Sequence, residues 1–382
     1  MPIKTLSQLS KPLLKMASHS PVYYQAQART TRVLAKLPDR LLVTLVNRLD
    51  PQPRFASADP LMQLIMAANN LGSGSGIITS NIKSSRQRFN HSVNALQGAK
   101  PAVHSVRDLS FKNRHKQRIK LRHYVPQLDS TATTQTAAEL PLIVFFHGGG
   151  FALGNIETHD EFCHYLCHYA GFSVLSVDYR LSPEHAAPAA IHDCMDAVVW
   201  AADNVKKLGY KAGKIIVAGD SAGGNLATVV CQQLLKTDHT VRPIMQWLIY
   251  PATDAKGQYD SHKAYGAGTL LSLRDKDLFQ SFYTSDSQDT DHTVTSPIYG
   301  TLEGLPPAYV AVAELDILSD EGEAYAQRLA DNGITTAYDK APGMPHGFIT
   351  LVSIHPGARR QTIAMIKAMR DFYDQTLGSK VH

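Results

Sequence analysis

The sequence predicts an α/β protein with a mostly parallel central sheet, helices on both faces of the sheet and a helical cap. The first observation is a series of short, continuous apolar runs, which are typical of buried parallel strands. The second is that helical stretches separate most of these runs, and such alternation produces a sheet covered on both sides. The third is a polar, partly helical segment between two of the runs, about residues 252–297, placed as an inserted cap would be.

The beginning of the chain is expected to be helical. Leucine and valine recur there near helical spacing, so residues 1–100 are assigned to an N-terminal helical cap or extension and residues 101–382 to the α/β domain. The G-S-G-S-G run of Gly72–Gly76 is interpreted as a flexible connector. A phosphate-binding loop would follow a strand and precede Lys-Ser/Thr, and this run does neither.

The remainder alternates strands with helices. Basic and apolar residues alternate over Arg118–His123, which predicts an antiparallel strand with one solvated face. A loop rich in Ser and Thr follows at Asp129–Ala138. Later strands are expected at Leu142–Phe146, Phe172–Val177, Ile215–Ala218, Met245–Tyr250, Tyr309–Ala313 and Thr335–Asp339. Helices are expected at His159–Tyr169, Ala190–Lys207, Ala222–Leu235, Leu273–Phe282, Glu321–Asp331 and Ala358–Tyr373.

Composition predicts a soluble, cytoplasmic protein. The 382 residues are 44% hydrophobic, yet no apolar run approaches the roughly 18 residues that a membrane span needs. Residues Met1–Ser20 lack the unbroken apolar stretch of a signal peptide. Four cysteines in a chain of this length do not indicate a disulfide framework.

Positive charge is concentrated at the start of the chain. Residues 1–100 hold thirteen Lys and Arg against three Asp, within a net charge of +5 for the whole protein. The favoured interpretation is a solvated basic subdomain lying against an acidic one; docking onto an anionic membrane is the alternative. Nucleic acid is not expected as a partner, because aromatic residues do not interleave with the basic ones.

The pattern Gly219-Asp220-Ser221-Ala222-Gly223 fits G-x-S-x-G between a predicted strand and a predicted helix. A serine on so sharp a turn takes a strained backbone, and the glycines let strand and helix approach closely around it. The sequence therefore predicts Ser221 as an exposed nucleophile.

A serine nucleophile needs a base, and the base needs an orienting acid. Asp316 lies just after the strand at Tyr309–Ala313, and His346 follows the last predicted strand within P-H-G-F. These two residues are predicted as acid and base. Asp320 is the alternative acid, but its expected place inside the following helix argues against it.

The loop His147–Phe151, H-G-G-G-F, directly follows the strand at Leu142–Phe146. Its glycines leave backbone N–H groups bare. Together with the N–H of Ala222 they are predicted to bind the oxyanion of a tetrahedral intermediate.

These motifs resemble the hormone-sensitive-lipase-like family of α/β-hydrolase esterases (bacterial family IV), in its G-D-S-A-G-G branch. The resemblance covers about Leu140 to the C-terminus. It is carried by H-G-G-G-F, by D-Y-R-L-S-P-E-H-A-A-P at Asp178–Pro188, by G-D-S-A-G-G, by D-x-L-x-D-E and by P-H-G-F. It implies an α/β-hydrolase fold for residues 101–382 and short- to medium-chain acyl esters as substrates.

The resemblance also implies the roles of site residues. Ser221, Asp316 and His346 would be the triad. Oxyanion donors would come from Gly149, Gly150 and Ala222, with Gly148 adjacent, and structural support from His147, Asp220, Tyr179, Arg180 and Glu184. Two departures are Ile317, where the family usually has proline, and the roughly 140 residues before H-G-G-G, which imply an enlarged or divergent N-terminal cap.

Cys163-His164 and Cys167-His168 form a C-H-x-x-C-H repeat on a predicted helix. Because positions i and i+4 share a helix face, a soft-metal site is the alternative interpretation. A closed site would need further ligands, so no metal is expected and the cysteines are interpreted as small buried apolar residues.

The sequence thus predicts a serine carboxylesterase that acts through an acyl-enzyme and needs no cofactor. An amidase or deacetylase with the same triad is the first alternative, since the leaving-group preference depends on the cap and pocket. A non-catalytic small-molecule binder is disfavoured, because all three triad residues are present. The expected partners are a small ester substrate and, by the resemblance, a second copy pairing through an edge strand.

Overall fold

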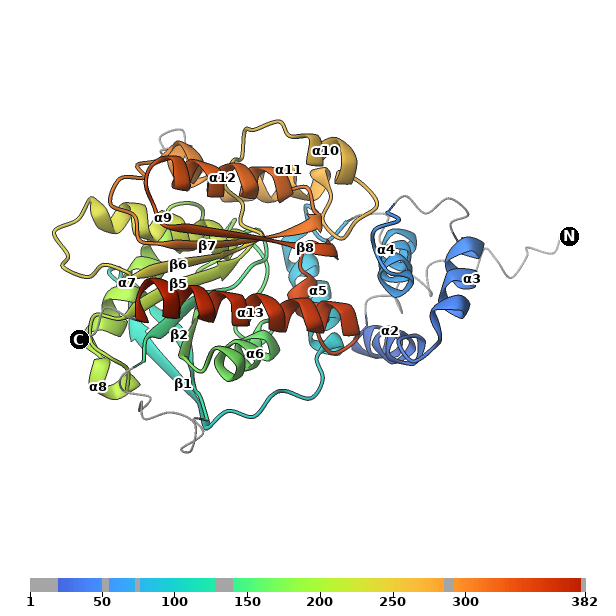
Figure 1. The fold of residues 1–382 in the computed structure, drawn as a ribbon, viewed down its shortest axis with the longest axis horizontal. Coiled ribbons are helices and arrows are strands. Elements are labelled where there is room, and N and C mark those ends of the chain that lie inside the picture. Colours follow the sequence, from blue (N-terminus) through green and yellow to red (C-terminus); the bar gives the residue numbers. More distant parts are fainter. Residues whose placement is uncertain (1–19, 50–54, 73–75, 128–139, 285–291, 379–382) are drawn as a thin grey trace, which may run out of the picture.

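The computed structural model describes residues 20–49, 55–72, 76–127, 140–284 and 292–378. Its centre is an eight-stranded sheet in the order β1-β2-β4-β3-β5-β6-β7-β8 (Figure 1). The first two strands run antiparallel to their neighbours, and all pairs from β4 to β8 are parallel. The strands are β1 (Ser105–Lys112), β2 (Arg118–Val125), β3 (Leu142–Phe146), β4 (Ser173–Asp178), β5 (Ile215–Asp220), β6 (Met245–Ile249), β7 (Ala308–Leu315) and β8 (Thr336–Pro345).

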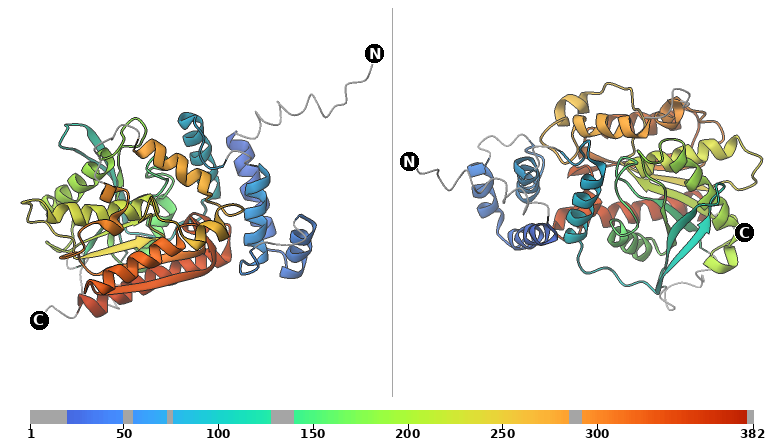
Figure 2. Two further views of the ribbon diagram at one scale, coloured as in Figure 1. Left: turned by 90° about the horizontal axis from the view of Figure 1, so that it is seen from above. Right: turned by 180° about the vertical axis from the view of Figure 1, so that it is seen from behind.

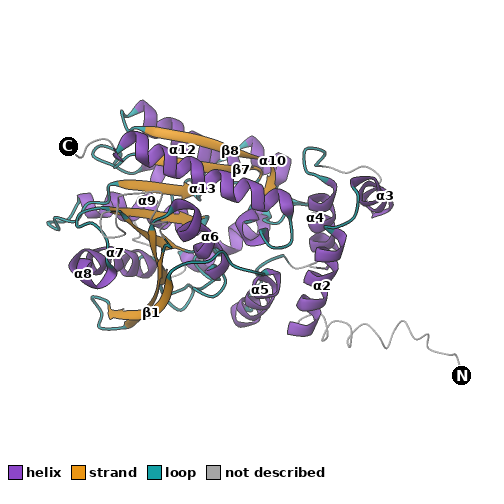
Figure 3. Ribbon diagram, turned by 60° about the horizontal axis from the view of Figure 1, so that its bottom comes forward, coloured by secondary structure: helices purple, strands orange, loops and turns teal. Residues whose placement is uncertain are grey.

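Two apolar layers enclose the sheet, because successive side chains of a strand point to opposite faces. In β3, Val144 and Phe146 join the layer formed with helices α7 (Ala189–Asp203), α9 (Ala222–Leu235) and α12 (Ser319–Asp331). Ile143 and Phe145 point the other way, against α6 (Asp160–Ala170) and α13 (Pro356–Thr376). Figure 3 shows the strands between these helices. The predicted fold class is confirmed.

The strands and helices differ from the prediction mainly at the ends and edges. Strand β1 was not predicted; it lies at the edge of the sheet, and among its residues only Phe111 is buried, so its apolar pattern is weak. Strand β8 continues to Pro345, directly before His346. The helix predicted over Ala190–Lys207 is broken at Asn204 into α7 and α8 (Val205–Leu208).

In the described part of the N-terminal region, four helices lie at one side of the sheet (Figures 1 and 2). They are α2 (Pro21–Leu34), α3 (Asp39–Leu49), α4 (Pro60–Gly72) and α5 (Ile82–Leu96). Leu42 and Val46 of α3 pack with Leu61 and Leu64 of α4 in a small separate apolar cluster. Arg32 of α2 donates to the carbonyls of residues 95, 96 and 97 at the end of α5, where a helix has unpaired acceptors.

The segment between β6 and β7 contains α10 (Asp260–Tyr265), α11 (Leu273–Tyr283) and the short 3₁₀ helices η2 (His292–Val294) and η3 (Pro297–Tyr299). A capping box of Ser272 and Asp275 begins α11. Asp275 also accepts the backbone N–H of Ile78 at 3.3 Å. The insertion therefore contacts the N-terminal segment.

Some expectations lie outside the described residues: the signal-peptide assessment of residues 1–19, the centre of the glycine-serine connector at 73–75 and the loop within 128–139. Among the helices of the described ranges, none combines the length and apolarity needed to cross a bilayer.

Candidate active site

Ser221 lies at the junction of β5 and α9 with φ 57° and ψ −120°. A non-glycine residue in this region carries strain of about 1–3 kcal/mol, which the surroundings must hold. The N–H of Ser221 donates to Ile249 O at 2.8 Å, and its carbonyl accepts from Asn225 N at 3.1 Å. A Cβ on Gly223 would overlap the carbonyl oxygen of Phe146 on the neighbouring strand. The turn predicted at G-x-S-x-G is thus present, with Ser221 facing the cavity described below.

A hydrogen-bonded chain joins Ser221 to His346 and Asp316. His346 Nε2 lies 2.8 Å from Ser221 Oγ, and His346 Nδ1 lies 2.6 Å from Asp316 Oδ2. Asp316 is fully buried, and its Oδ1 accepts the N–H of Leu318 at 2.9 Å. A carboxylate can only accept, so Nδ1 carries a proton and Nε2 is free to accept from the serine hydroxyl. Asp320, the alternative acid, instead accepts the N–H of Ser261 at 2.8 Å.

The glycine loop after β3 presents backbone amides beside Ser221. Gly149 and Gly150 have φ of 121° and 59°, and a Cβ on Gly150 would overlap the ring of Phe279 from α11. Gly149, Gly150 and Ala222 all line the cavity. Among the described residues, none of these three N–H groups donates a hydrogen bond in a turn, loop or helix cap. The N–H of Gly148, in contrast, donates to Asp220 Oδ1 at 2.7 Å. The three free amides can therefore serve an oxyanion, and Gly148 holds the loop.

Buried polar side chains contact the glycine loop. Burial alone would raise the pKa of Asp220, but the interactions with His159 and the Gly148 N–H outweigh it and lower the pKa below its usual 3.8. His159 Nε2 lies 3.3 Å from Asp220 Oδ1. Burial, with His159 nearby, lowers the pKa of His147 to about 3, so its ring is neutral. The ring stacks on Tyr179 at 4.3 Å, and the Tyr179 hydroxyl donates to His147 O at 2.6 Å.

Arg180 and Glu184 make different contacts. Arg180 binds Asp193 through Nε at 2.8 Å and Nη2 at 2.9 Å. The Glu184 carboxylate accepts hydrogen bonds from Nη1 and Nη2 of Arg86, at 2.8 Å and 2.6 Å. Arg86 lies on α5 and also donates from Nε to Ala152 O at 2.8 Å and from Nη2 to Ser182 O at 2.7 Å. It thereby connects helix α5 to the chain that continues the glycine loop.

Sequence reasoning missed Arg86, and no motif marks it. It lies about 60 residues before H-G-G-G-F in a helix with several other basic side chains. His159 and the contact between Phe279 and Gly150 were missed for the same reason: each joins segments that are distant in the sequence.

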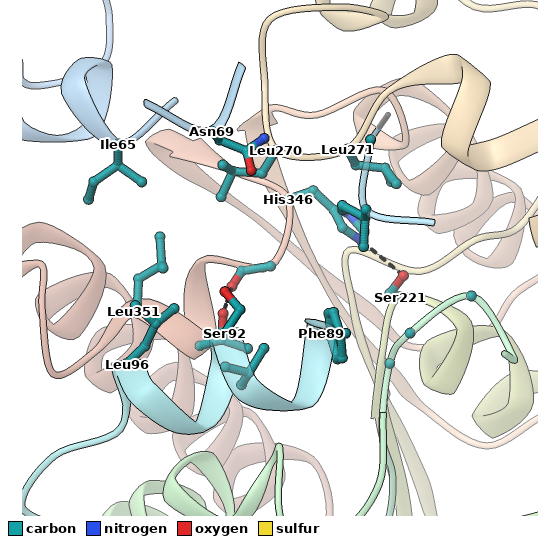
Figure 4. Close-up of a pocket in the computed structure, with 18 of the residues that line it drawn as sticks. Ile65, Asn69, Phe89, Ser92, Leu96, Ser221, Leu270, Leu271, His346 and Leu351 are labelled. Carbon is teal, nitrogen blue, oxygen red and sulfur yellow. Dashed lines mark hydrogen bonds between the residues drawn. The ribbon is translucent and has the colours of Figure 1, made fainter. Parts of the chain in front are cut away.

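A cavity of about 670 Å³ opens over Ser221 and His346. Figure 4 shows these two residues at one end, with Phe89 beside them and with Ile65, Leu96 and Leu351 across the cavity. Lys276 and Glu321 line another part of its wall. Lys276 Nζ is 3.1 Å from Glu321 Oε2, which is fully buried, and donates to Asp254 O at 3.3 Å.

The C-H-x-x-C-H repeat lies on α6. Cys163 and Cys167 are buried with free thiols, and burial raises the pKa of both. His164 Nδ1 and His168 Nδ1 contact the carbonyls of Pro101 and Ala102 at 3.1 Å and 2.8 Å. Across the described part of the chain, no three His, Cys, Asp or Glu side chains are grouped as metal ligands.

Comparison with known proteins identifies the family of this chain. The family model described as the alpha/beta hydrolase fold matches residues 143–350. Lipase 2 of Moraxella sp. is 33% identical over 100% of this chain and 98% of its own length. The carboxylic ester hydrolase LipN of Mycobacterium tuberculosis is 38% identical over 82% of each chain. The ethyl acetate hydrolase of Pseudomonas putida is 31% identical over 81% of this chain and 96% of its own length.

Two solved structures are also similar to this chain. A variant of an α/β hydrolase enzyme from the metagenome of Lake Arreo superposes with a TM-score of 0.74 at 35% identity, covering 83% of this chain and 98% of that one. A thermostable esterase from Pseudomonas putida has a TM-score of 0.73 at 30% identity, covering 81% and 96%.

Proposed function

Because the chain belongs to the hormone-sensitive-lipase-like (bacterial family IV) α/β hydrolases and is a carboxylic ester hydrolase, we propose that it is a serine carboxylesterase whose triad is Ser221, His346 and Asp316. One observation carries the proposal: the unbroken hydrogen-bonded chain of 2.8 Å and 2.6 Å from the serine hydroxyl to the buried carboxylate.

In the acylation step, Ser221 Oγ attacks the ester carbonyl while His346 Nε2 takes its proton. Asp316 accepts the hydrogen bond from Nδ1 and stabilises the imidazolium that forms. The oxyanion is bound by the amides of Gly149, Gly150 and Ala222, and the last of these is at the positive end of helix α9. His346 then gives its proton to the departing alcohol, and the acyl group stays on Ser221.

In the deacylation step, water takes the place of the alcohol. His346 removes a proton from the water, the hydroxide adds to the acyl carbonyl, and a second oxyanion forms in the same amide pocket. Collapse of this intermediate breaks the bond to Ser221 Oγ, which recovers its proton from His346. The carboxylic acid leaves, and no step needs a metal or organic cofactor.

We place the substrates among short- to medium-chain acyl esters. Relatives that bear the names ethyl acetate hydrolase and lipase support a range of chain lengths rather than a single acid. An amide substrate attacked by the same triad remains the alternative. Matched ester and amide substrates with one acyl group would separate the two. Pairing of two chains through an edge strand stays a prediction; β1 and β8 are the two edges.

The test is turnover of p-nitrophenyl acetate and butyrate by the wild type, Ser221→Ala and Asp316→Asn. Loss of the nucleophile is expected to remove activity, and Asp316→Asn to lower kcat by about 10⁴ through the wrong imidazole tautomer. Asp320→Asn, which changes the nearby carboxylate outside the hydrogen-bonded chain, is the matched control and should keep kcat within about threefold. Wild-type rates in Ser221→Ala would end the proposal.

A further inference from the structure

We propose that Tyr250, directly after β6, is a positioning residue for the base of the triad. Its ring covers one face of the His346 imidazole and fixes the plane in which that imidazole exchanges protons. The inference rests on the proposed function, since it concerns the same triad.

Tyr250 has an uncommon backbone conformation. Its φ is 34°, in the left-handed region that residues with a Cβ rarely adopt. Its N–H donates to Ala311 O on β7 at 2.5 Å, and the preceding carbonyl, Ile249 O, accepts the N–H of Ser221 at 2.8 Å. Two residues with positive φ, Ser221 and Tyr250, are therefore connected at the ends of the neighbouring strands β5 and β6. Such residues persist only where their surroundings hold them, and they cluster at active sites.

The positive φ places the Tyr250 ring on an unexpected side of the sheet. Side chains alternate along a strand, so Tyr250 would follow Leu248 into the layer formed with α7, α9 and α12. Ile249 points to the opposite layer, formed with α6 and α13. Tyr250 packs in that second layer as well, together with Phe348. The strained backbone thus turns the ring toward the segment after β8, which carries His346.

The Tyr250 ring lies against the imidazole from inside the protein. The two ring centroids are 4.7 Å apart, with an angle of 54° between the planes. Phe348 packs edge-on against the same tyrosine, with centroids 5.6 Å apart. Tyr250 is fully buried, and it is not among the described residues that line the cavity. It therefore acts on His346 without contacting substrate.

The two hydrogen bonds of His346 leave one rotation of its ring free. Nδ1 faces Asp316 and Nε2 faces Ser221, so these bonds hold the imidazole at two ends. Rotation about the line between the two ends would tilt the ring while keeping both partners within reach. The lone pair that takes the proton lies in the ring plane, so a tilt directs it away from Ser221 Oγ and from the departing alcohol. A contact on the ring face prevents this tilt.

The same contact suits the charge that His346 acquires. An imidazolium forms in acylation and again in deacylation. An aromatic ring within about 6 Å attracts a cation through the negative potential of its face, most strongly where water is excluded. Tyrosine and phenylalanine both supply this face, whereas leucine and methionine do not. The ring at position 250 thus favours the protonated base in both steps.

The Tyr250 hydroxyl has a smaller part. It donates to Asp220 Oδ2 at 3.4 Å, and burial raises the pKa of Tyr250, which keeps the hydroxyl protonated. Asp220 has a shorter contact with the glycine loop, where its Oδ1 accepts the N–H of Gly148 at 2.7 Å. Removing the hydroxyl should therefore disturb the site much less than removing the ring.

The experiment compares Tyr250→Phe, Tyr250→Met and Tyr250→Leu in steady-state hydrolysis of p-nitrophenyl acetate and butyrate. Misplacing a reacting group by about 1 Å can cost on the order of 10² in rate. We expect the methionine and leucine variants to lose about 10- to 100-fold in kcat, by the same factor for both substrates. KM should stay within about two-fold, and Tyr250→Phe should keep kcat within about three-fold.

Tyr373→Leu is the matched control. Tyr373 of α13 is also buried, and its ring lies 5.0 Å from that of Phe172, which precedes β4 at the opposite edge of the sheet. The same substitution there removes a packed ring far from the triad. It should lower Tm, as Tyr250→Leu does, but keep kcat within about two-fold. A residue that only fills the core would behave like this control.

The outcomes separate the inference from its premise. A loss of ten-fold or more in Tyr250→Phe overturns it and assigns the effect to the hydroxyl. Wild-type kcat in a folded leucine or methionine variant overturns it as well, as does a rise in KM without a fall in kcat. If neither of these two variants folds, Tyr250→Phe decides alone. In every case Ser221-dependent hydrolysis by the wild type leaves the proposed function standing, and its absence removes the premise.

Discussion

Replacing Arg86 with methionine should weaken both the fold and catalysis, because this side chain holds buried carbonyls beside the glycine loop. Its Nε and Nη2 donate to Ala152 O and Ser182 O, and these two residues are 0% and 1% exposed. Ser182 in turn donates its N–H to Phe151 O at 2.9 Å. Arg86 therefore fixes the segment directly after Gly149 and Gly150.

The magnitude follows from those contacts. A buried acceptor that loses its donor costs about 1–3 kcal/mol. The Arg86 side chain is itself 26% exposed, so water can reach part of the space that the guanidinium leaves. The combined cost for the two carbonyl acceptors is therefore about 2–4 kcal/mol. The ion pair with Glu184, whose side chain is 52% exposed, contributes less than about 1 kcal/mol. With an unfolding entropy of about 2.1 cal/mol/K per residue, Tm should fall by about 3–5 °C.

The catalytic effect should appear in kcat. Complete loss of one oxyanion donor costs on the order of 10²–10³ in rate. Arg86→Met loosens the loop without removing a donor, so we expect kcat to fall by about ten-fold and KM to change less. Arg86→Lys should recover little, since an ammonium cannot reproduce the guanidinium fork.

The assay is steady-state hydrolysis of p-nitrophenyl butyrate together with thermal unfolding. Gln87→Met, at the adjacent exposed position of α5, is the matched control for helix composition. Glu184→Gln keeps the carbonyl contacts and should change kcat and Tm little. Wild-type kcat in folded Arg86→Met would refute the reasoning, and a full loss in Glu184→Gln would assign the effect to the ion pair instead.

Two further predictions concern buried charge. Burial, with Arg107 nearby, lowers the pKa of His123 from 6.5 to about 4. Between these two pH values the unfolded chain binds about one more proton than the folded chain. The free energy of unfolding therefore falls by up to about 1.4 kcal/mol per pH unit as the pH drops through that window. His123→Gln should remove this contribution to the pH dependence of the free energy of unfolding, measured by urea denaturation between pH 4.5 and 7.5. An unchanged pH dependence would contradict the prediction. Lys276→Met removes the ammonium 3.1 Å from the fully buried Glu321, leaving only the His262 ring at 3.9 Å beside that oxygen among the described residues, and should cost about 3–5 kcal/mol in thermal unfolding. Adding Glu321→Gln should restore most of this stability, since the amide oxygen can still accept from Thr253 and Asp254, and a double variant as unstable as the single one would exclude the pairing as the cause.

The parts of the fold that the sequence predicted are those with local causes. Strands buried on both faces need continuous apolar runs, so β3 to β7 could be found from runs alone. The turn at Ser221 needs glycines within a few residues, and His346 needs only to follow the last strand. Strand β1 was missed because an edge strand with one buried residue has no such requirement.

The contacts that the sequence did not predict join distant segments. Arg86 meets Glu184 across 98 residues, and Phe279 touches Gly150 across 129 in chain numbering. Many arrangements of helices are compatible with the same local patterns. Which basic side chain of α5 reaches the glycine loop depends on the rotation of that helix, which tertiary packing sets.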